Sequence, residues 1–149
     1  MSTLADLQTH TNTFLELHWP GDAPRPRWSE SPWRFEGAIP QQEARGCYAL
    51  IGKHGEVLYV GVGAGRNAGR YEGAGLGARL HRYWQKDPET PRLPDGTPKY
   101  APTSKYTEVR EIATIGFRDE AKELWYLAYA LEPFLISKLN PEMNTVWRR

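Results

Sequence analysis

The sequence predicts an α+β fold, in which a small sheet packs against helices. Two short runs rich in β-branched and aromatic residues, 47–51 and 57–60, flank a four-residue turn with glycine at both ends, which is typical of a hairpin. A third such run covers residues 109–117, and segments with helical spacing precede and follow the strands. With 149 residues, 40% hydrophobic and 25% charged, the chain fits one globular domain with a modest core.

The first 40 residues predict a helix and an irregular arm. Residues 3–17 have amphipathic spacing, with Leu4, Leu7, Phe14 and Leu15 on the expected buried face. Residues 19–40 contain five prolines and interleave basic with aromatic side chains, namely Arg25, Arg27, Trp28, Trp33, Arg34 and Phe35. Such a segment can stack its rings on nucleic-acid bases. We favour an arm that docks its indoles on the core, because aromatic side chains dominate core burial.

The hairpin carries one tyrosine on each strand, Tyr48 and Tyr59. Strand pairing brings the two phenols towards one region of one sheet face. The single cysteine, Cys47, lies on the first strand and can form neither an internal disulfide nor a cysteine zinc site. We expect Cys47 to be a small buried apolar residue.

After the hairpin we expect a glycine-rich loop over residues 61–77, a helix over 76–84 and a proline-rich surface loop over 87–107. The strand at 109–117 leads to a helix at 120–131. Pro133 disfavours a continuous helix, so it predicts a second helix that begins at Pro133 and ends near Leu139. This break would place Glu132 at a helix amino terminus, where negative charge is favoured.

Net charge is only +1, but basic residues gather beside the hairpin. Between residues 61 and 86 a single acid, Glu72, accompanies Arg66, Arg70, Arg79, Arg82 and Lys86. This segment can attract a phosphate backbone or be an ordinary solvated face. His81 lies two residues from Arg79 and points to a different helical face, which favours a surface or DNA-facing role.

Four polar residues outside the hairpin complete a candidate site. Arg79 and Tyr83 are one helical turn apart and share a face. Glu132 lies in an apolar stretch, where a carboxylate needs a cation or an arginine beside it, and Asn144 can fix a backbone segment. With the tyrosines, these residues suit phosphodiester hydrolysis, which needs cations at the phosphate and a base for the attacking group. Two strand tyrosines with one salt-bridged glutamate are the structural alternative.

The chain resembles the GIY-YIG nuclease family over residues 46–144. Gly46-Cys47-Tyr48 matches the first motif and Tyr59-Val60-Gly61 the second. Residues 76–84 resemble the arginine helix of the family, and Leu131-Glu132-Pro133-Phe134-Leu135-Ile136 with Pro141 and Asn144 resembles its closing motif. Four short motifs in order, with fitting spacing, make this likeness specific.

The resemblance implies a three-stranded antiparallel sheet flanked by helices, as a nuclease domain over residues 41–149 behind the helix and arm of 1–40. Tyr59 would be the general base with Tyr48 beside it, Arg79 would stabilise the phosphate, and Tyr83 and Asn144 would support them. Glu132 would be the only protein ligand of one Mg²⁺ or Mn²⁺ ion. The implied reaction is metal-dependent cleavage of double-stranded or branched DNA that leaves 5′-phosphate and 3′-hydroxyl ends, with Arg66, Arg70, His81, Arg82 and Lys86 as expected DNA contacts.

Two features depart from the family pattern. Val62 stands where many members carry a lysine that lowers the pKa of the second tyrosine, and the loop at 61–77 is long. Arg66 or Arg70 can supply positive charge there, although an arginine cannot accept a proton. A binding module of the same fold that does not cut is therefore an alternative, and a protein-interaction domain that uses Trp28 and Trp33 is another.

The sequence also carries expectations about location and assembly. No apolar run approaches the length of about 20 residues that a membrane helix needs, and the amino terminus lacks a basic-then-apolar signal pattern. We expect a cytoplasmic protein that makes no membrane contact. A homodimer or a protein partner is compatible with the sequence.

Overall fold

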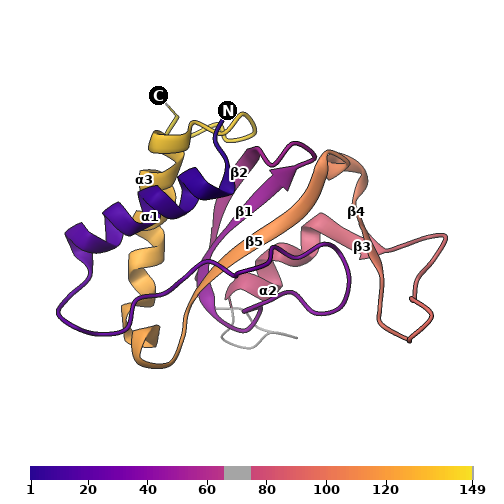
Figure 1. Ribbon diagram of the computed structural model, residues 1–149, viewed down its shortest axis with the longest axis horizontal. Helices are drawn as coiled ribbons and strands as arrows, with labels where there is room; N and C mark the ends of the chain where they lie inside the picture. Colours follow the sequence, from indigo (N-terminus) through magenta and orange to yellow (C-terminus); the bar gives the residue numbers. More distant parts are fainter. Residues whose placement is uncertain (66–74, 149) are drawn as a thin grey trace.

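The computed structural model describes residues 1–65 and 75–148 (Figure 1). Its architecture is α+β, with a three-stranded antiparallel sheet in the order β2-β1-β5. The strands are β1 (Arg45–Gly52), β2 (Val57–Gly63) and β5 (Val109–Phe117), which lie where the sequence predicts them. Among the helices of the described residues, none combines the length and the apolar character that crossing a membrane requires.

Helices cover both faces of the sheet. On one face, α1 (Leu4–His18) packs with α3 (Ala128–Leu139), and on the other lies α2 (Gly75–Leu80). A capping box between Thr3 and Asp6 fixes the start of α1, and Leu7, Thr11, Phe14 and Leu15 form its buried face. Leu4, expected on that face, is only partly buried.

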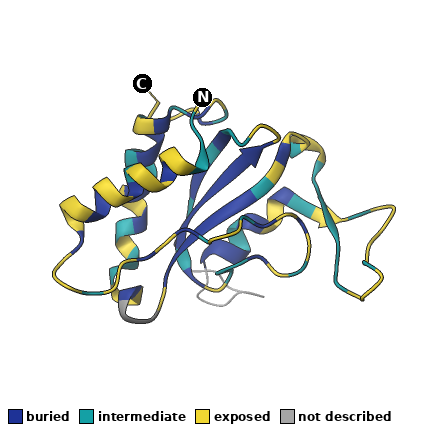
Figure 2. Cartoon of the chain, in the orientation of Figure 1, coloured by how far each residue is buried: buried dark blue, intermediate teal, exposed yellow. Residues whose placement is uncertain are grey.

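The central strand feeds two separate hydrophobic clusters, because alternate side chains of a strand point to opposite faces. Cys47 and Ile51 face the cluster under α1 and α3, whereas Tyr48 and Leu50 face the cluster under α2. Figure 2 shows the three strands buried along most of their length, with exposure concentrated on the outer helix faces and the loops. The register is therefore tightly specified, since a slip by one residue would exchange the two faces.

The arm is docked on the sheet. Trp28 and Trp33 are 6% and 4% exposed, and they form isolated antiparallel bridges with Ile115 and Ile112 of β5. The arm thus covers the outer edge of β5, which would otherwise present unpaired backbone groups. The preferred interpretation of the arm is confirmed. The alternative that these indoles stack on nucleic-acid bases is wrong, because both rings are in the core.

The segment between β2 and β5 is more structured than the sequence indicates. α2 ends at Leu80 and continues as the 3₁₀ helix η1 (His81–Tyr83) and the strand β3 (Trp84–Lys86), so the helix predicted through residue 84 is too long. β3 pairs with β4 (Tyr100–Pro102), and the 3₁₀ helix η2 (Ser104–Tyr106) follows. Residues 87–107 are therefore not one irregular loop. Tertiary pairing overrides the helical spacing here, since the Trp84 ring packs against Tyr100 at 4.7 Å between centroids.

α2 begins at Gly75, within the stretch that its glycine content assigned to a loop. A side chain on Gly75 would overlap the carbonyl oxygen of Gly63 on β2. Glycine is required here because helix and strand backbones touch, and not because the segment must bend. The loop prediction is wrong for Gly75 and Gly77, while residues 66–74 lie outside the described part of the chain.

The carboxyl-terminal helices also differ from the prediction. A 3₁₀ helix, η3 (Asp119–Leu127), leads directly into α3, and Pro133 lies inside α3. The predicted break at Pro133 is wrong. Proline removes one hydrogen bond to the carbonyl four residues earlier, which belongs to Tyr129. Tyr129, which carries this carbonyl, is 48% exposed, so this turn of α3 borders solvent.

Replacing the buried indole of the arm should destabilise the fold. We expect Trp33→Ala to lower the free energy of unfolding by about 3–5 kcal/mol in urea denaturation, because it leaves a cavity and removes the indole N–H that donates to the carbonyls of Glu36 and Gly37. Trp147 is 59% exposed, so Trp147→Ala is the matched control, with a change within about 0.5 kcal/mol. Equal losses in the two variants would contradict the docked arm.

Candidate functional site

A buried tyrosine forms the centre of the candidate site. Tyr48 is fully buried on β1 and lies opposite Gly61 of β2. A Cβ on Gly61 would overlap the phenol ring of Tyr48. The glycine of the second strand therefore makes room for the tyrosine of the first, which is a physical reason for the two residues to face one another.

The Tyr48 hydroxyl is held by groups from α2 and η1, which pack on the sheet face that Tyr48 points to. It shares a hydrogen bond of 2.6 Å with the hydroxyl of Tyr83, and the Arg79 guanidinium donates to its oxygen. Burial raises the pKa of Tyr83 to about 12 and raises that of Tyr48 further, with the Tyr83 hydroxyl adding to the effect. Both phenols are therefore protonated at neutral pH, and they position their neighbours instead of accepting protons.

Tyr59 is the accessible phenol of this cluster. Its ring centroid lies 6.1 Å from that of Tyr48, so the hairpin brings the two rings together as the sequence predicts. Unlike Tyr48 and Tyr83, it is only partly buried. The pair Tyr48 and Tyr83 thus forms a buried support, and Tyr59 presents its hydroxyl beside it.

Glu132 reaches the same region from α3. Its carboxylate accepts the backbone N–H of Val62 at the edge of β2 and interacts electrostatically with Arg79. Burial raises the pKa of the carboxyl, while Arg79 and the Val62 N–H act against that rise. The prediction that Glu132 begins a helix is wrong, because α3 starts at Ala128. Its charge is therefore stabilised by Arg79 and one backbone N–H, and not by a helix amino terminus.

Cys47 lies beneath this carboxylate. Burial raises the pKa of its thiol well above the ordinary range, and the charge of Glu132 adds to the rise. The thiol group donates to the carbonyl of Ala128 over 3.3 Å. Cys47 is thus a protonated core residue, as the sequence predicts.

Asn144 fixes the backbone of β2. Its side-chain oxygen accepts the Val60 N–H and its side-chain nitrogen donates to the Val60 carbonyl, each over 3.0 Å. β2 is an edge strand, and the Asn144 amide satisfies both groups that Val60 presents on its outer side. Because Val60 follows Tyr59 directly, this contact holds the backbone that carries the accessible phenol.

The structure describes three of the five residues expected to contact DNA. His81, Arg82 and Lys86 are exposed on η1 and β3, next to the tyrosine cluster. Arg66 and Arg70 lie outside the described residues. Tyr106 was missed at the sequence level, since it falls in the segment predicted as a loop, yet its ring packs edge-on against Tyr83 at 4.6 Å. In the sequence, its aromatic character is the only signal that could have pointed to Tyr106.

Within the described residues, no group of three or more His, Cys, Asp or Glu side chains has a metal-binding arrangement. A site with one carboxylate, such as Glu132 would provide, is not a group of that kind. Comparison of the chain with protein-family models, curated proteins and solved structures yields no significant match.

Loss of the Asn144 amide should weaken the edge of β2. We expect Asn144→Ala to lower the free energy of unfolding by about 2–4 kcal/mol, because it leaves the buried N–H and C=O of Val60 unpaired. Asn12→Ala changes an exposed helical asparagine and serves as the matched control, with an effect within about 0.5 kcal/mol. Urea denaturation measures both, and an unaffected Asn144→Ala protein would exclude this role.

The raised pKa of Glu132 makes stability depend on pH. A carboxyl whose pKa is higher in the folded than in the unfolded chain contributes stability below the unfolded value, and this is lost as pH rises through the folded value. The neutral Glu132→Gln variant should therefore gain in melting temperature relative to the wild type between pH 4 and pH 7, with divalent cations chelated. The exposed Glu142→Gln control should show no such trend. A Glu132→Gln difference that is flat with pH would refute the assignment.

Proposed function

We propose that this chain is a GIY-YIG-type, metal-dependent DNA endonuclease that hydrolyses phosphodiester bonds. One observation carries the proposal: two protonated buried phenols and an arginine surround a third, accessible phenol, and a half-buried carboxylate lies at the same strand edge. The antiparallel order β2-β1-β5, with α2 and α3 packed against β2, agrees with the fold that the motifs imply.

Tyr59 is the proposed general base. Tyr48 and Tyr83 are buried and hydrogen-bonded to one another, so of the two hairpin tyrosines Tyr59 is the one that can reach a substrate. It would accept the proton of the attacking water, a step that typically contributes 10²–10⁴-fold to the rate. Asn144 holds the adjacent Val60 backbone and so orients Tyr59.

Arg79 is the proposed phosphate ligand. Its Nε is buried and has no hydrogen-bond partner among the described residues. Its guanidinium is meanwhile anchored by the Tyr48 oxygen, so the group is oriented before substrate arrives. A buried, unpaired donor on a fixed cation suits an oxygen that gains negative charge in the transition state.

Glu132 is the proposed ligand of one Mg²⁺ or Mn²⁺ ion. The fit is chemical: the carboxylate is half-buried, and Val62 N–H and Arg79 are the partners that stabilise its charge, so a hard cation at its oxygens would relieve the cost of burial. Mg²⁺ usually keeps several waters and binds through one or two carboxylates plus substrate oxygens. When bound, the ion would supply positive charge at the phosphate.

The alternative of a module that binds DNA without cutting it rests on Val62. Its side chain packs against the hydrophobic cluster under α3, and its backbone N–H serves Glu132, so it brings no positive charge to Tyr59. The protein-interaction alternative requires Trp28 and Trp33 to be available to a partner, but both are buried in this chain.

Cleavage assays test the proposal. On supercoiled plasmid, flapped and branched DNA with Mg²⁺ or Mn²⁺, we expect nicking by the wild type. Tyr59→Phe should reduce the rate by about 10²–10⁴-fold and Arg79→Gln by about 10²–10³-fold. Glu132→Gln should abolish cleavage. Tyr129→Phe removes an exposed hydroxyl from α3 and is the matched control for Tyr59→Phe, with an unchanged rate.

A second readout separates metal binding from turnover. Mg²⁺ should raise the melting temperature of the wild type but not that of Glu132→Gln, because the ion binds only the folded carboxylate site. If the wild type shifts DNA on a gel yet leaves every form intact, the chain is a binding module and the nuclease proposal fails.

A further inference from the structure

A basic cleft lies between the arm and the sheet, away from the tyrosine cluster. It has a volume of about 610 Å³ and opens between residues 24–30 of the arm, the end of β5 and the start of η3. Arg25, Arg27 and Arg118 line it, and Glu30 is the one acid among the described residues of its lining. We name it the arginine cleft.

The two arginines of the arm are presented by a regular alternation. Arg25 and Arg27 are exposed, whereas Pro26 and Trp28 between and after them are buried. In an extended chain, residues two apart point to the same side and stand about 6.6 Å apart. The buried neighbours thus leave both arginine side chains exposed at the cleft.

The walls of the cleft are fixed. The Trp28 indole donates to the Thr11 hydroxyl over 2.8 Å, which ties the arm to α1. On the floor, the Gln41 side chain donates to the Thr114 carbonyl and accepts the Gly116 N–H over 2.8 Å. A Cβ on Gly116 would crowd the Gln41 side-chain oxygen, so glycine is needed there. The backbone that carries Arg25 and Arg27 is therefore tied to the rest of the fold by hydrogen bonds.

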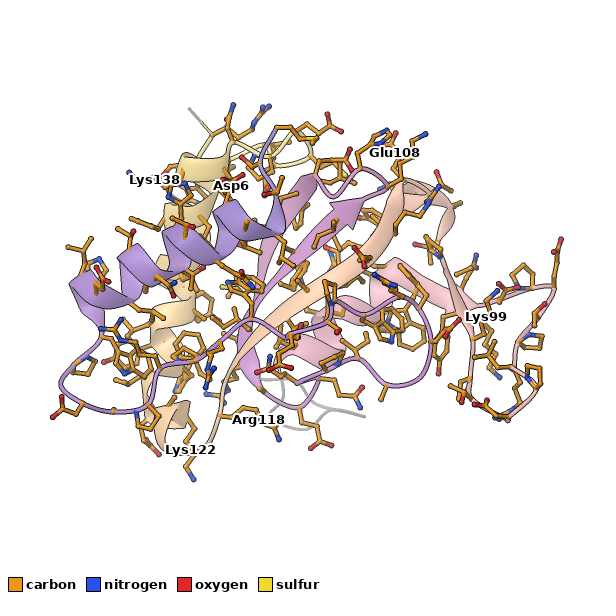
Figure 3. The ribbon with its side chains drawn as sticks, in the orientation of Figure 1. Asp6, Lys99, Glu108, Arg118, Lys122 and Lys138 are labelled. Atoms are coloured by element: carbon orange, nitrogen blue, oxygen red, sulfur yellow. The ribbon has the colours of Figure 1, made fainter. Side chains whose placement is uncertain are left out.

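The positive charge of the cleft is not neutralised within the described side chains. The ion pairs found there are Arg34 with Glu111 and Lys99 with Asp87, and neither involves the cleft. Arg118 and Lys122 lie together at the lower edge of Figure 3, beside the end of β5. Lys122 is exposed four residues beyond Arg118, and it lines a neighbouring pocket with Glu43 and Glu123.

The cleft is linked to the tyrosine cluster through β1. Gly116 at its floor pairs with Gly46, and Tyr48 lies two residues further along the same strand. The cleft therefore lies on the β5 side of the sheet, whereas Tyr59 is on β2 at the opposite edge. A spaced row of arginines matches a phosphate backbone, because each guanidinium can bind phosphate oxygens in a bidentate manner.

We infer that the arginine cleft binds the phosphate backbone of DNA as a second contact surface beside the proposed nuclease site. This inference rests on the proposed function for its ligand class. The contacts are to phosphates and carry no base specificity, so they add affinity and orient the duplex without selecting a sequence.

A salt titration of DNA binding tests the inference. The probe is a fluorescent 20-base-pair duplex of arbitrary sequence, and the variant combines Arg25→Gln, Arg27→Gln and Arg118→Gln. We expect affinity at low salt to fall about tenfold or more and the slope of log K against log salt to become shallower by about 2–3, near one per lost contact. The matched control combines Arg92→Gln, Lys105→Gln and Arg110→Gln, which removes the same charge from exposed sites outside the cleft.

The outcomes separate the two hypotheses. If the cleft variant binds as tightly as the control while Tyr59→Phe still abolishes cleavage, the cleft inference is overturned and the nuclease proposal stands. If the wild type binds without cutting and the cleft variant loses binding, the cleft stands and the nuclease proposal fails. If the cleft variant retains DNA affinity but loses binding to a polyglutamate peptide, the surface serves an acidic protein and the inference is overturned.

Discussion

The fold depends on satisfying one buried hydroxyl. Tyr48 stands on the central strand with no exposure, and a buried hydroxyl without a partner would cost about 1–3 kcal/mol. Its partners are Tyr83 of η1 and Arg79 of α2, so both elements must pack against the sheet where Tyr48 stands. The close approach requires glycine where the backbones meet, at Gly63 and Gly75. The same constraint leaves Tyr59 as the phenol that solvent can reach.

Both edges of the sheet are closed by segments that are not strands of it. The arm bridges β5 through Trp28 and Trp33, and Asn144 binds both outward groups of Val60 on β2. A three-stranded sheet has two edges that can pair with other chains, and here each is covered by irregular chain. Each covering also fixes a neighbouring feature, because one holds the backbone beside Tyr59 and the other carries the two arginines that line the cleft.

The sequence predicted the strands well, because both their β-branched and aromatic composition and the glycine turn depend on local chemistry. It failed where tertiary contacts outweigh local preference. Pro133 lies inside α3 although proline is a helix breaker, in a turn of the helix that carries the exposed residue Tyr129. Trp84 has helical spacing with Leu80, yet it is in a strand because its ring packs on Tyr100. For the candidate site, the residue types were visible in the sequence, but the support of Glu132 by Val62 was not.

The sequence alone determined the α+β class, the hairpin and the residues that meet around Tyr48, because strand composition and glycine positions are properties of short stretches of the chain. Only the tertiary structure decided which of these residues is exposed and which is buried and supports its neighbours. It buried Tyr48 and Tyr83 against one another, left Tyr59 accessible and kept an Arg79 nitrogen unpaired. The reason is that burial and hydrogen-bond partners arise from contacts between distant segments, and these contacts separate the two buried phenols from the accessible one.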